Sequence, residues 1–117
     1  MTGVGGYLKE RPVRVELVGV QPDSPEHGIS GLKHLATADV PGIYDPQIVD
    51  RTVDVKTSDA KRMARELTRE EGLFVGISAG AAVTAALKVA RSLEEGVVVA
   101  LLADGGFKYA SAPFWTA

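Results

Sequence analysis

The sequence predicts an α/β fold, an incomplete parallel sheet with covering helices, in a single domain. Two observations carry this prediction. Apolar runs of strand length alternate with segments of helical periodicity, which is the pattern of βαβ units with right-handed crossovers. The first helical segment, residues 2–10, has no strand before it, although such a Gly-rich helix follows a strand in a doubly wound sheet. We therefore expect the chain to begin in the middle of such a unit.

The first half of the chain predicts two strands separated by a long loop. Residues 13–20 read VRVELVGV between two prolines, as expected for a strand buried on both faces, and residues 52–56 form a shorter strand. Between them, residues 21–50 hold four of the six prolines and both histidines without sustained periodicity. A loop of this length in a compact domain is usually functional or mobile.

The second half predicts two helices and two more strands. Ser58 is the expected N-cap of an amphipathic helix that ends before Gly72, with Arg62 and Glu66 as an exposed pair one turn apart. Residues 73–77 are apolar and of strand length. Residues 79–93 form an Ala-rich helix that we expect to be largely buried, and residues 97–103, VVVALLA, are the strongest strand in the chain.

Composition limits the classes of function. The 117 residues carry a net charge of -2, with 45% hydrophobic and 24% charged residues, which is typical of one soluble globular domain. With no cysteine and two histidines, neither disulfides nor a metal site are expected. The balanced charge argues against nucleic-acid and membrane partners. No apolar run approaches the ~20 residues of a membrane span and no export signal is evident, so we expect a cytoplasmic protein.

Residues 76–80, GISAG, fit the pattern G-x-S-x-G and lie between a predicted strand and a predicted helix, where a nucleophile elbow would be. A hydrolase of that class needs an acid and then a histidine after the serine, whereas His27 and His34 both precede Ser78. Alternatively, Ser78 is a helix N-cap among small residues that allow close helix–strand packing.

Asp104 directly follows the last predicted strand. The carboxyl ends of parallel strands bind ligands in α/β sheets, so we expect Ser78 and Asp104 to open onto the same rim. The alternative for Asp104 is a turn residue that starts the Asp-Gly-Gly bend.

Other polar and aromatic residues have two interpretations each. Lys33 and His34 lie in the long loop, where they could bind an anion or simply be solvated. Phe114 and Trp115 are expected to anchor the C-terminal tail or to contact a partner.

Several segments together resemble one family. They are residues 18–22 (VGVQP), 29–35 (ISGLKHL), 40–45 (VPGIYD), 72–82 (GLFVGISAGAA) and 104–109 (DGGFKY). Their order and spacing are similar to those of the pyridoxal-phosphate enzymes of the cysteine synthase and cystathionine β-synthase group, the B-type cysteine synthases above all. The resemblance implies the tryptophan-synthase-β-like fold, fold type II. It also implies that residues 1–117 are the C-terminal portion of the larger, cofactor-binding domain.

The activity implied by this resemblance is β-replacement. An activated serine such as O-acetylserine loses its leaving group, and a sulfur donor takes its place to give L-cysteine. By similarity, Ser78 would hydrogen-bond the pyridine nitrogen of the cofactor and Gly76 would line the cofactor site. Asp104 would handle protons or orient the substrate, and Lys33 and His34 would face the sulfur donor, whose identity stays open.

The resemblance also implies that part of the site is absent from these 117 residues. The Schiff-base lysine of the family lies in an upstream Ser-x-Lys-Asp-Arg segment, and none of the lysines of this chain has such a context. The phosphate-binding loop would end just before Met1. We expect the chain alone to bind no cofactor and to be inactive. It would need the N-terminal region or a complementary chain, and the enzyme is expected to be a homo-oligomer.

A second hypothesis is a non-catalytic structural or interaction fragment. The strand at residues 97–103 and the helix from Ala79 have the apolar composition of elements that are covered on both sides, and uncovered surfaces of this kind seek partners. A serine hydrolase remains a third possibility.

Overall fold

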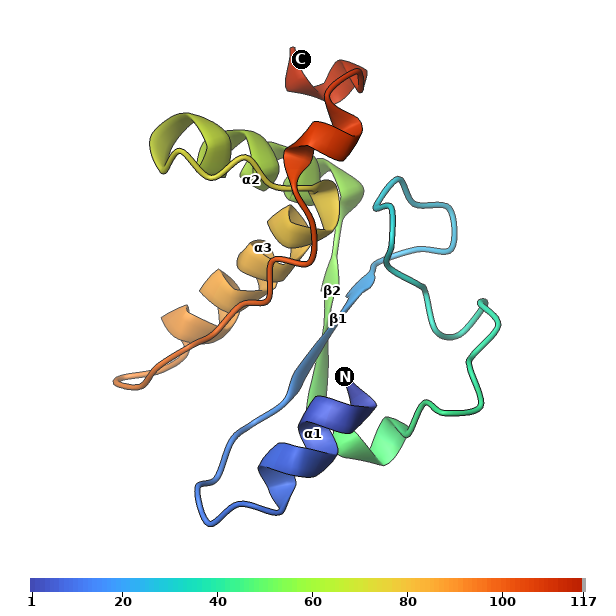
Figure 1. Ribbon diagram of the computed structural model, residues 1–117, viewed down its shortest axis with the longest axis vertical. Helices are drawn as coiled ribbons and strands as arrows, with labels where there is room; N and C mark the ends of the chain where they lie inside the picture. The colour runs from blue at the N-terminus through green and yellow to red at the C-terminus, as the bar shows by residue number, and fades with distance from the viewer. Residues whose placement is uncertain (117) are drawn as a thin grey trace.

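In the computed structural model, which describes residues 1–116, two parallel strands are combined with three α-helices (Figure 1). In chain order the elements are α1 (Thr2–Lys9), β1 (Val18–Pro22), β2 (Arg51–Val55), α2 (Thr57–Glu70) and α3 (Ile77–Arg91). Three short 3-10 helices lie at Pro46–Ile48, Gly106–Tyr109 and Pro113–Trp115. Within residues 1–116, no helix combines the length and the apolar character that crossing a bilayer requires.

The sheet confirms the predicted α/β class and the parallel direction of the strands. β1 pairs with β2 in a register that sets Val18 opposite Arg51 and Pro22 opposite Val55. Pro22 and Val55 are fully buried. The connection between the strands is the irregular segment 23–50. Most of it extends away from α2 and α3 in Figure 1, whereas Ile29 near its start packs into the core with them. This segment was predicted as a loop, and only one 3-10 turn interrupts it.

Two predicted strands do not form, and a third is shifted. Residues 73–77 and 97–103 enter no ladder within residues 1–116, where Val75 makes only an isolated antiparallel bridge with Gly105. The first strand begins at Val18 rather than at residue 13, because β2 offers only five residues to pair with. A strand exists only where a neighbour supplies the complementary N–H and C=O groups, and apolar composition alone does not supply them.

The start of α2 differs from the prediction. Its N-cap is Lys56, and the helix begins at Thr57, so the prediction of Ser58 as N-cap was wrong. The hydroxyl of Thr57 is engaged elsewhere, because it accepts a hydrogen bond from the Gly28 amide (3.1 Å) and ties the loop to the helix.

The predicted end of α2 and its surface ion pair are confirmed. Gly72 has a φ of +70°, a conformation that favours glycine after a helix. This turn allows the amide of Leu73 to bond the carbonyl of Leu67 (3.0 Å). Arg62 and Glu66 form the expected exposed pair at 3.3 Å.

Small residues let α2 and α3 pack closely. A Cβ at Gly80 would collide with the carbonyl oxygen of Ala60 and would come within 2.9 Å of the amide nitrogen of Ala64. The Ala-rich helix, predicted to be largely buried, is buried at seven of its fifteen residues, and Leu87 near its end is 39% exposed. The core cluster contains Ile29, Val55, Ala60, Ala64, Ile77, Ala81, Ala85 and Phe114.

The C-terminal aromatic residues anchor the tail, as predicted. Phe114 is buried in the core cluster, and its carbonyl accepts a hydrogen bond from Arg65 (2.8 Å). The ring of Trp115 lies 4.3 Å from that of Phe114 and 5.1 Å from that of Phe74. These contacts hold residues 104–116 against α2 and the start of α3.

Candidate functional site

Two turns that are distant in sequence meet where α3 begins. The amide of Gly76 donates to the carbonyl of Asp104 (3.1 Å), and the amide of Gly106 donates to the carbonyl of Phe74 (3.0 Å). Gly76 is the N-cap of α3, and Ser78 is the second residue of the helix. The structure therefore brings Gly76 into contact with Asp104, and Ser78 lies two residues farther along the chain.

Gly76 is required by the side chain of Asp104. A Cβ at this position would overlap Oδ1 of Asp104 and would lie 2.8 Å from a ring carbon of Tyr109. The carboxylate therefore lies directly against the Cα of Gly76, in space that any other residue would fill.

The Asp104 carboxylate is held by one strong hydrogen bond. Its Oδ2 accepts from the hydroxyl of Tyr109 at 2.5 Å, and the ammonium of Lys108 lies 3.9 Å from the same oxygen. Its Oδ1 is buried and has no hydrogen-bond partner within residues 1–116. The side chain is only 16% exposed. Asp104 thus fastens the C-terminal turn to the start of α3, which agrees with the turn interpretation and leaves its chemical role a proposal.

The contact with Asp104 changes the pKa of the Tyr109 phenol. The hydrogen bond to Asp104, followed by burial and by the negative charge of that carboxylate, raises the pKa of Tyr109 above its usual value, while Ser30 acts in the opposite direction. Each of the three raising effects disfavours a second negative charge beside the carboxylate. Ser30 belongs to the long loop, so the loop reaches the edge of the site at this phenol.

The hydroxyl of Ser78 is free to bind a ligand. Ser78 is half-buried in the first turn of α3, and the N-cap is Gly76, so the alternative of Ser78 as N-cap is wrong. Its hydroxyl takes part in none of the side-chain hydrogen bonds found among residues 1–116. A neutral hydroxyl that can donate or accept is thus presented at the end of the helix where unpaired amides gather.

The histidines give Ser78 no general base. Nδ1 of His27 accepts a hydrogen bond from the amide of Ile29 (3.2 Å), and Nδ1 of His34 pairs with the hydroxyl of Thr37 (2.9 Å). In the part of the chain that the structure describes, neither ring is bonded to Ser78. The hydrolase alternative therefore lacks the serine–histidine contact on which it depends.

Lys33 and His34 are not joined to the other candidate residues by any hydrogen bond or ion pair within residues 1–116. Lys33 donates to the carbonyl of Asp39 (3.2 Å) and lines a small cavity of about 150 Å³ beside β1. The base of their loop is nevertheless fixed, because Ile29 is fully buried in the core cluster against which Leu32 packs. Their assignment to a sulfur donor stays a prediction.

Tyr109 is the residue of this site to which the sequence interpretation gave no role. Its signal was present in residues 104–109, where an aspartate and a tyrosine flank a Gly-Gly bend. A further hydrogen bond, from the indole N–H of Trp115 to the carbonyl of Tyr109 (2.7 Å), fixes the turn that carries it.

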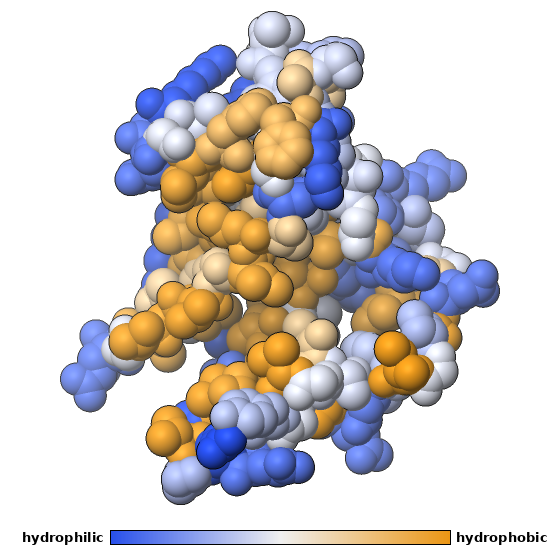
Figure 2. Space-filling view, viewed as in Figure 1, coloured by the Kyte–Doolittle hydropathy of each residue, from blue (hydrophilic) through white to orange (hydrophobic). Residues whose placement is uncertain are grey.

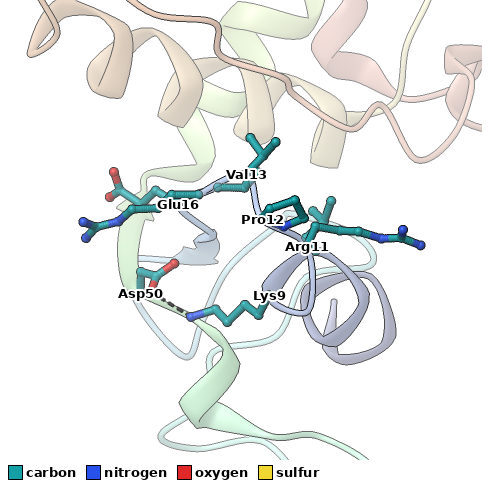
Figure 3. Close-up of a pocket in the computed structure, with 9 residues that line it drawn as sticks. Lys9, Arg11, Pro12, Val13, Glu16 and Asp50 are labelled. Atoms are coloured by element: carbon teal, nitrogen blue, oxygen red, sulfur yellow. Dashed lines mark hydrogen bonds and ion pairs between the residues drawn. The ribbon is translucent and has the colours of Figure 1, made fainter.

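A larger hollow, of about 820 Å³, lies elsewhere in the molecule (Figure 3). Lys9 and Asp50 form an ion pair of 2.8 Å in it, and the second oxygen of Asp50 accepts from the amide of Leu17 (2.7 Å). The Leu17 amide, and then Lys9, hold the pKa of Asp50 below its usual value. Because Asp50 directly precedes β2, this hollow borders the amino ends of the strands. Ligands of parallel sheets bind at the carboxyl ends, so the edge with Ser78 is the better candidate.

Known proteins resemble this chain over most of its length. Residues 1–104 match the family model described as pyridoxal-phosphate dependent enzyme. The chain is 46% identical over 111 residues to the cysteine synthase of Aquifex aeolicus, covering 92% of this chain and 34% of that protein. It is 43% identical to cysteine synthase B of Pseudomonas aeruginosa, covering 93% of this chain and 36% of the relative.

A solved structure also matches nearly all of this chain and about a third of its own length. The cysteine synthase of Entamoeba histolytica superposes with a TM-score of 0.89 at 30% sequence identity, over 98% of this chain and 36% of that one. The chain therefore spans about a third of the length of the relatives that it matches.

Proposed function

Because the chain belongs to the family of pyridoxal-phosphate dependent enzymes, with their fold type II architecture, we propose that it is the C-terminal portion of the larger, cofactor-binding domain of a cysteine synthase. The complete enzyme would make L-cysteine from O-acetylserine, or a related activated serine, and a sulfur donor. The observation that supports this best is the contact of Gly76 with Asp104, two residues before Ser78, in a chain that matches 34% of a cysteine synthase.

The residues present fit one side of pyridoxal phosphate. A half-buried hydroxyl without a partner within residues 1–116, at the start of a 15-residue helix, suits a ring nitrogen that needs a neutral hydrogen-bond partner. When bound, the cofactor supplies a sink for the electrons released at the α-carbon of the amino acid. Ser78 would hold the ring nitrogen, and Gly76 would line the site.

The reaction balances without an added oxidant or reductant. The α-proton of the activated serine is removed, and the bond from its β-carbon to oxygen breaks, with the electron pair leaving on the carboxylate. The sulfur of the donor then bonds the β-carbon, and a proton returns to the α-carbon. Asp104, fixed by Tyr109, would orient the amino acid in this sequence, and Lys33 and His34 would hold the anionic donor.

We further propose that the chain alone is inactive and binds no cofactor. Four of its lysines have a partner: Lys9 and Lys108 pair with Asp50 and Asp104, and Lys33 and Lys88 donate to the carbonyls of Asp39 and Asp54. The lysine and the phosphate loop would come from the portion of the enzyme that this chain does not match. We expect the assembled enzyme to be a cytoplasmic homo-oligomer.

The test is reconstitution. The chain is co-expressed with the unmatched remainder of the Aquifex aeolicus cysteine synthase, and cysteine formation from O-acetylserine and sulfide is measured. We expect activity only when both parts are present. Ser78→Ala should lower kcat at least about tenfold and shift the absorption band of the cofactor, as expected for loss of one hydrogen bond at the reacting centre. Ser78→Thr, which keeps a hydroxyl, and Ser92→Ala, at the C-cap of α3, should retain activity.

Two results would contradict this proposal. One is a stable cofactor absorption band in the isolated chain that disappears when one of its lysines is replaced. The other is a reconstituted enzyme whose activity and spectrum are the same with serine or alanine at position 78.

A further inference from the structure

Tyr109 contacts two parts of the molecule that are far apart in sequence. Its hydroxyl donates to Oδ2 of Asp104 in the C-terminal turn (2.5 Å). Its side chain also packs against the core cluster that contains Ile29, at the base of the long loop. One side chain therefore lies between the candidate site and the loop that carries Lys33 and His34.

The base of the long loop is fixed to α2 and to the core. The amide of Gly28 donates to the hydroxyl of Thr57 at the start of α2 (3.1 Å). Ile29 is fully buried. The amide of Leu32 bonds the carbonyl of Ile29 (3.3 Å), and its side chain packs against the same core cluster. Residues 29–32 thus form a closed turn immediately before Lys33.

Ser30, which lies in this turn, reaches the phenol of Tyr109. The phenol has one hydrogen, which it donates to Asp104, so the hydroxyl of Ser30 can only donate to the phenol oxygen. A donated hydrogen bond stabilises an ionised phenol, which agrees with the direction in which Ser30 moves the pKa of Tyr109, namely downward. Two hydroxyls and a carboxylate therefore form one chain from the loop to the edge of the site.

Lys33 and His34 lie between two attachments of the loop. On one side is the turn at residues 29–32, and on the other the amide of Leu35 donates to the side chain of Gln21 in β1 (3.3 Å). Both side chains are bonded to other residues of the same loop. Their position relative to the site therefore depends on these two attachments.

The outer part of the loop faces solvent. Val40 and Ile43 are 48% and 87% exposed, so these apolar side chains do not anchor it. Figure 2 shows hydrophilic side chains along much of the right-hand side of the view, where the loop lies in Figure 1. Packing in this part of the loop thus cannot replace an attachment that is lost at its base.

From these contacts we propose that Tyr109 is a positioning residue, which fixes the base of the long loop through Ser30 and does not itself touch the sulfur donor. Lys33 and His34 are thereby held facing the site. The inference rests on the proposed function, in which these two residues hold the anionic donor. Loss of the Ser30 link should weaken binding of the donor and leave the cofactor side, at Ser78 on α3, unchanged.

The experiment uses the reconstituted enzyme, made of the full chain and the unmatched remainder of the Aquifex aeolicus cysteine synthase, with sulfide and thiosulfate as donors. Ser30→Ala removes the link but keeps the bond between Tyr109 and Asp104. We expect the KM for the donor that the enzyme uses to rise about three- to tenfold, the effect of one neutral hydrogen bond. The kcat, the KM for O-acetylserine and the absorption band of the cofactor should not change.

Three further variants isolate the link. Ser24→Ala is the matched control, because the hydroxyl of Ser24 donates to the carbonyl of Glu26 within the same loop (3.1 Å), and it should leave the donor KM unchanged. Ser30→Thr keeps a hydroxyl and should retain most of the parent value. In the double variant Ser30→Ala, Tyr109→Phe, the donor KM should equal that of Tyr109→Phe, because both changes remove the same link.

Hydrogen exchange of the chain alone tests the link without activity. The amides of Leu35 and Ala38 are hydrogen-bonded in the loop. In Ser30→Ala they should exchange about three- to tenfold faster than in the parent chain, because the loop opens more often. Amides within α2 should keep the rates of the parent, which distinguishes local opening of the loop from a loss of global stability.

The outcomes separate this inference from the proposed function. An active enzyme in which Ser30→Ala leaves the donor KM unchanged overturns the inference, and so does an equal rise with Ser24→Ala. An equal rise in the KM for O-acetylserine overturns it as well, since the change would then be general. If the reconstituted enzyme makes no cysteine, the proposed activity fails, and exchange of the loop alone decides whether Ser30 and Tyr109 fix it.

Discussion

The hydroxyl of Tyr109 lies 2.5 Å from Oδ2 of Asp104 and donates a hydrogen bond to it. The other oxygen of the same carboxylate is buried against Gly76 without a partner within residues 1–116. One hydrogen bond therefore holds a nearly enclosed carboxylate in place between the last turn of the chain and the beginning of α3. The consequences for stability and for pH dependence can be measured on the chain alone.

Replacing Tyr109 by phenylalanine removes the only direct side-chain hydrogen bond to this carboxylate within residues 1–116. We expect the free energy of unfolding to fall by about 1.5–3 kcal/mol, the range for hydrogen bonds to charged groups. Urea denaturation measures it. The control is Tyr7→Phe, an exposed tyrosine whose ring lies under Arg11, which should change stability by less than about 0.5 kcal/mol. Equal losses in the two variants would show that the hydrogen bond contributes nothing.

The raised pKa of Tyr109 predicts a loss of stability at alkaline pH. A phenol with a folded-state pKa above its unfolded value of 10.0 contributes stability that is complete below that value. This contribution disappears as pH rises through the folded-state pKa. Ultraviolet titration of a Tyr7→Phe, Tyr44→Phe background should show Tyr109 ionising late. Asp104→Asn should bring the titration to lower pH, and an unchanged curve would contradict the assigned cause.

Gly76→Ala should destabilise the chain by about 1–3 kcal/mol, because the new methyl group overlaps Oδ1 of Asp104. In the double variant with Asp104→Ala, the overlap with Oδ1 disappears while the close contact with the Tyr109 ring remains, so part of this penalty should vanish and the two effects should not add. Thermal or urea unfolding of the four proteins gives the interaction energy. As a control, Gly3→Ala has open space around the added methyl and should be neutral or stabilising. Strict additivity at positions 76 and 104 would show that the two residues do not meet.

The lowered pKa of Asp50 predicts a loss of stability at acid pH. Its pKa is lowered by the Leu17 amide and by Lys9, so its contribution to stability is present above its ordinary value of 3.8. That contribution is lost as pH falls through the folded-state pKa. Asp50→Asn should therefore flatten the acid limb of the stability profile, measured by urea unfolding at pH 2–7. Asp23→Asn, at an exposed carboxylate, serves as the control, and identical profiles for the two variants would contradict the prediction.

The sequence predicted the helices better than the strands. The periodicity of residues 79–93 and the glycine at position 72 are local signals, and α3 and the end of α2 agree with them within two residues. The apolar runs at 73–77 and 97–103 predicted strands that have no ladder within residues 1–116. Strand formation depends on a neighbour distant in sequence, and no local pattern reveals whether that neighbour is present.

The candidate site was predicted only in part, because it too depends on contacts between residues that are distant in sequence. The prediction that Ser78 and Asp104 share an edge rested on two strands, 73–77 and 97–103, that form no ladder within residues 1–116. The structure shows instead a contact of Asp104 with Gly76, two residues before Ser78. The prediction is therefore supported only in part, by the beginning of a helix and not by the ends of strands. It could not show that the Asp104 carboxylate turns inward to Tyr109, since the choice of rotamer depends on the missing Cβ of Gly76 and on the tail that Trp115 holds.

The chain contains a single tryptophan, and its position makes it a natural spectroscopic probe of the site. The indole of Trp115 packs against Phe74, two residues before Gly76, and its N–H is bonded to the carbonyl of Tyr109. Any movement of the Asp104 turn away from α3 changes the polarity around the indole. The fluorescence of the unlabelled chain can therefore follow docking of a partner or binding of a ligand at this edge in real time.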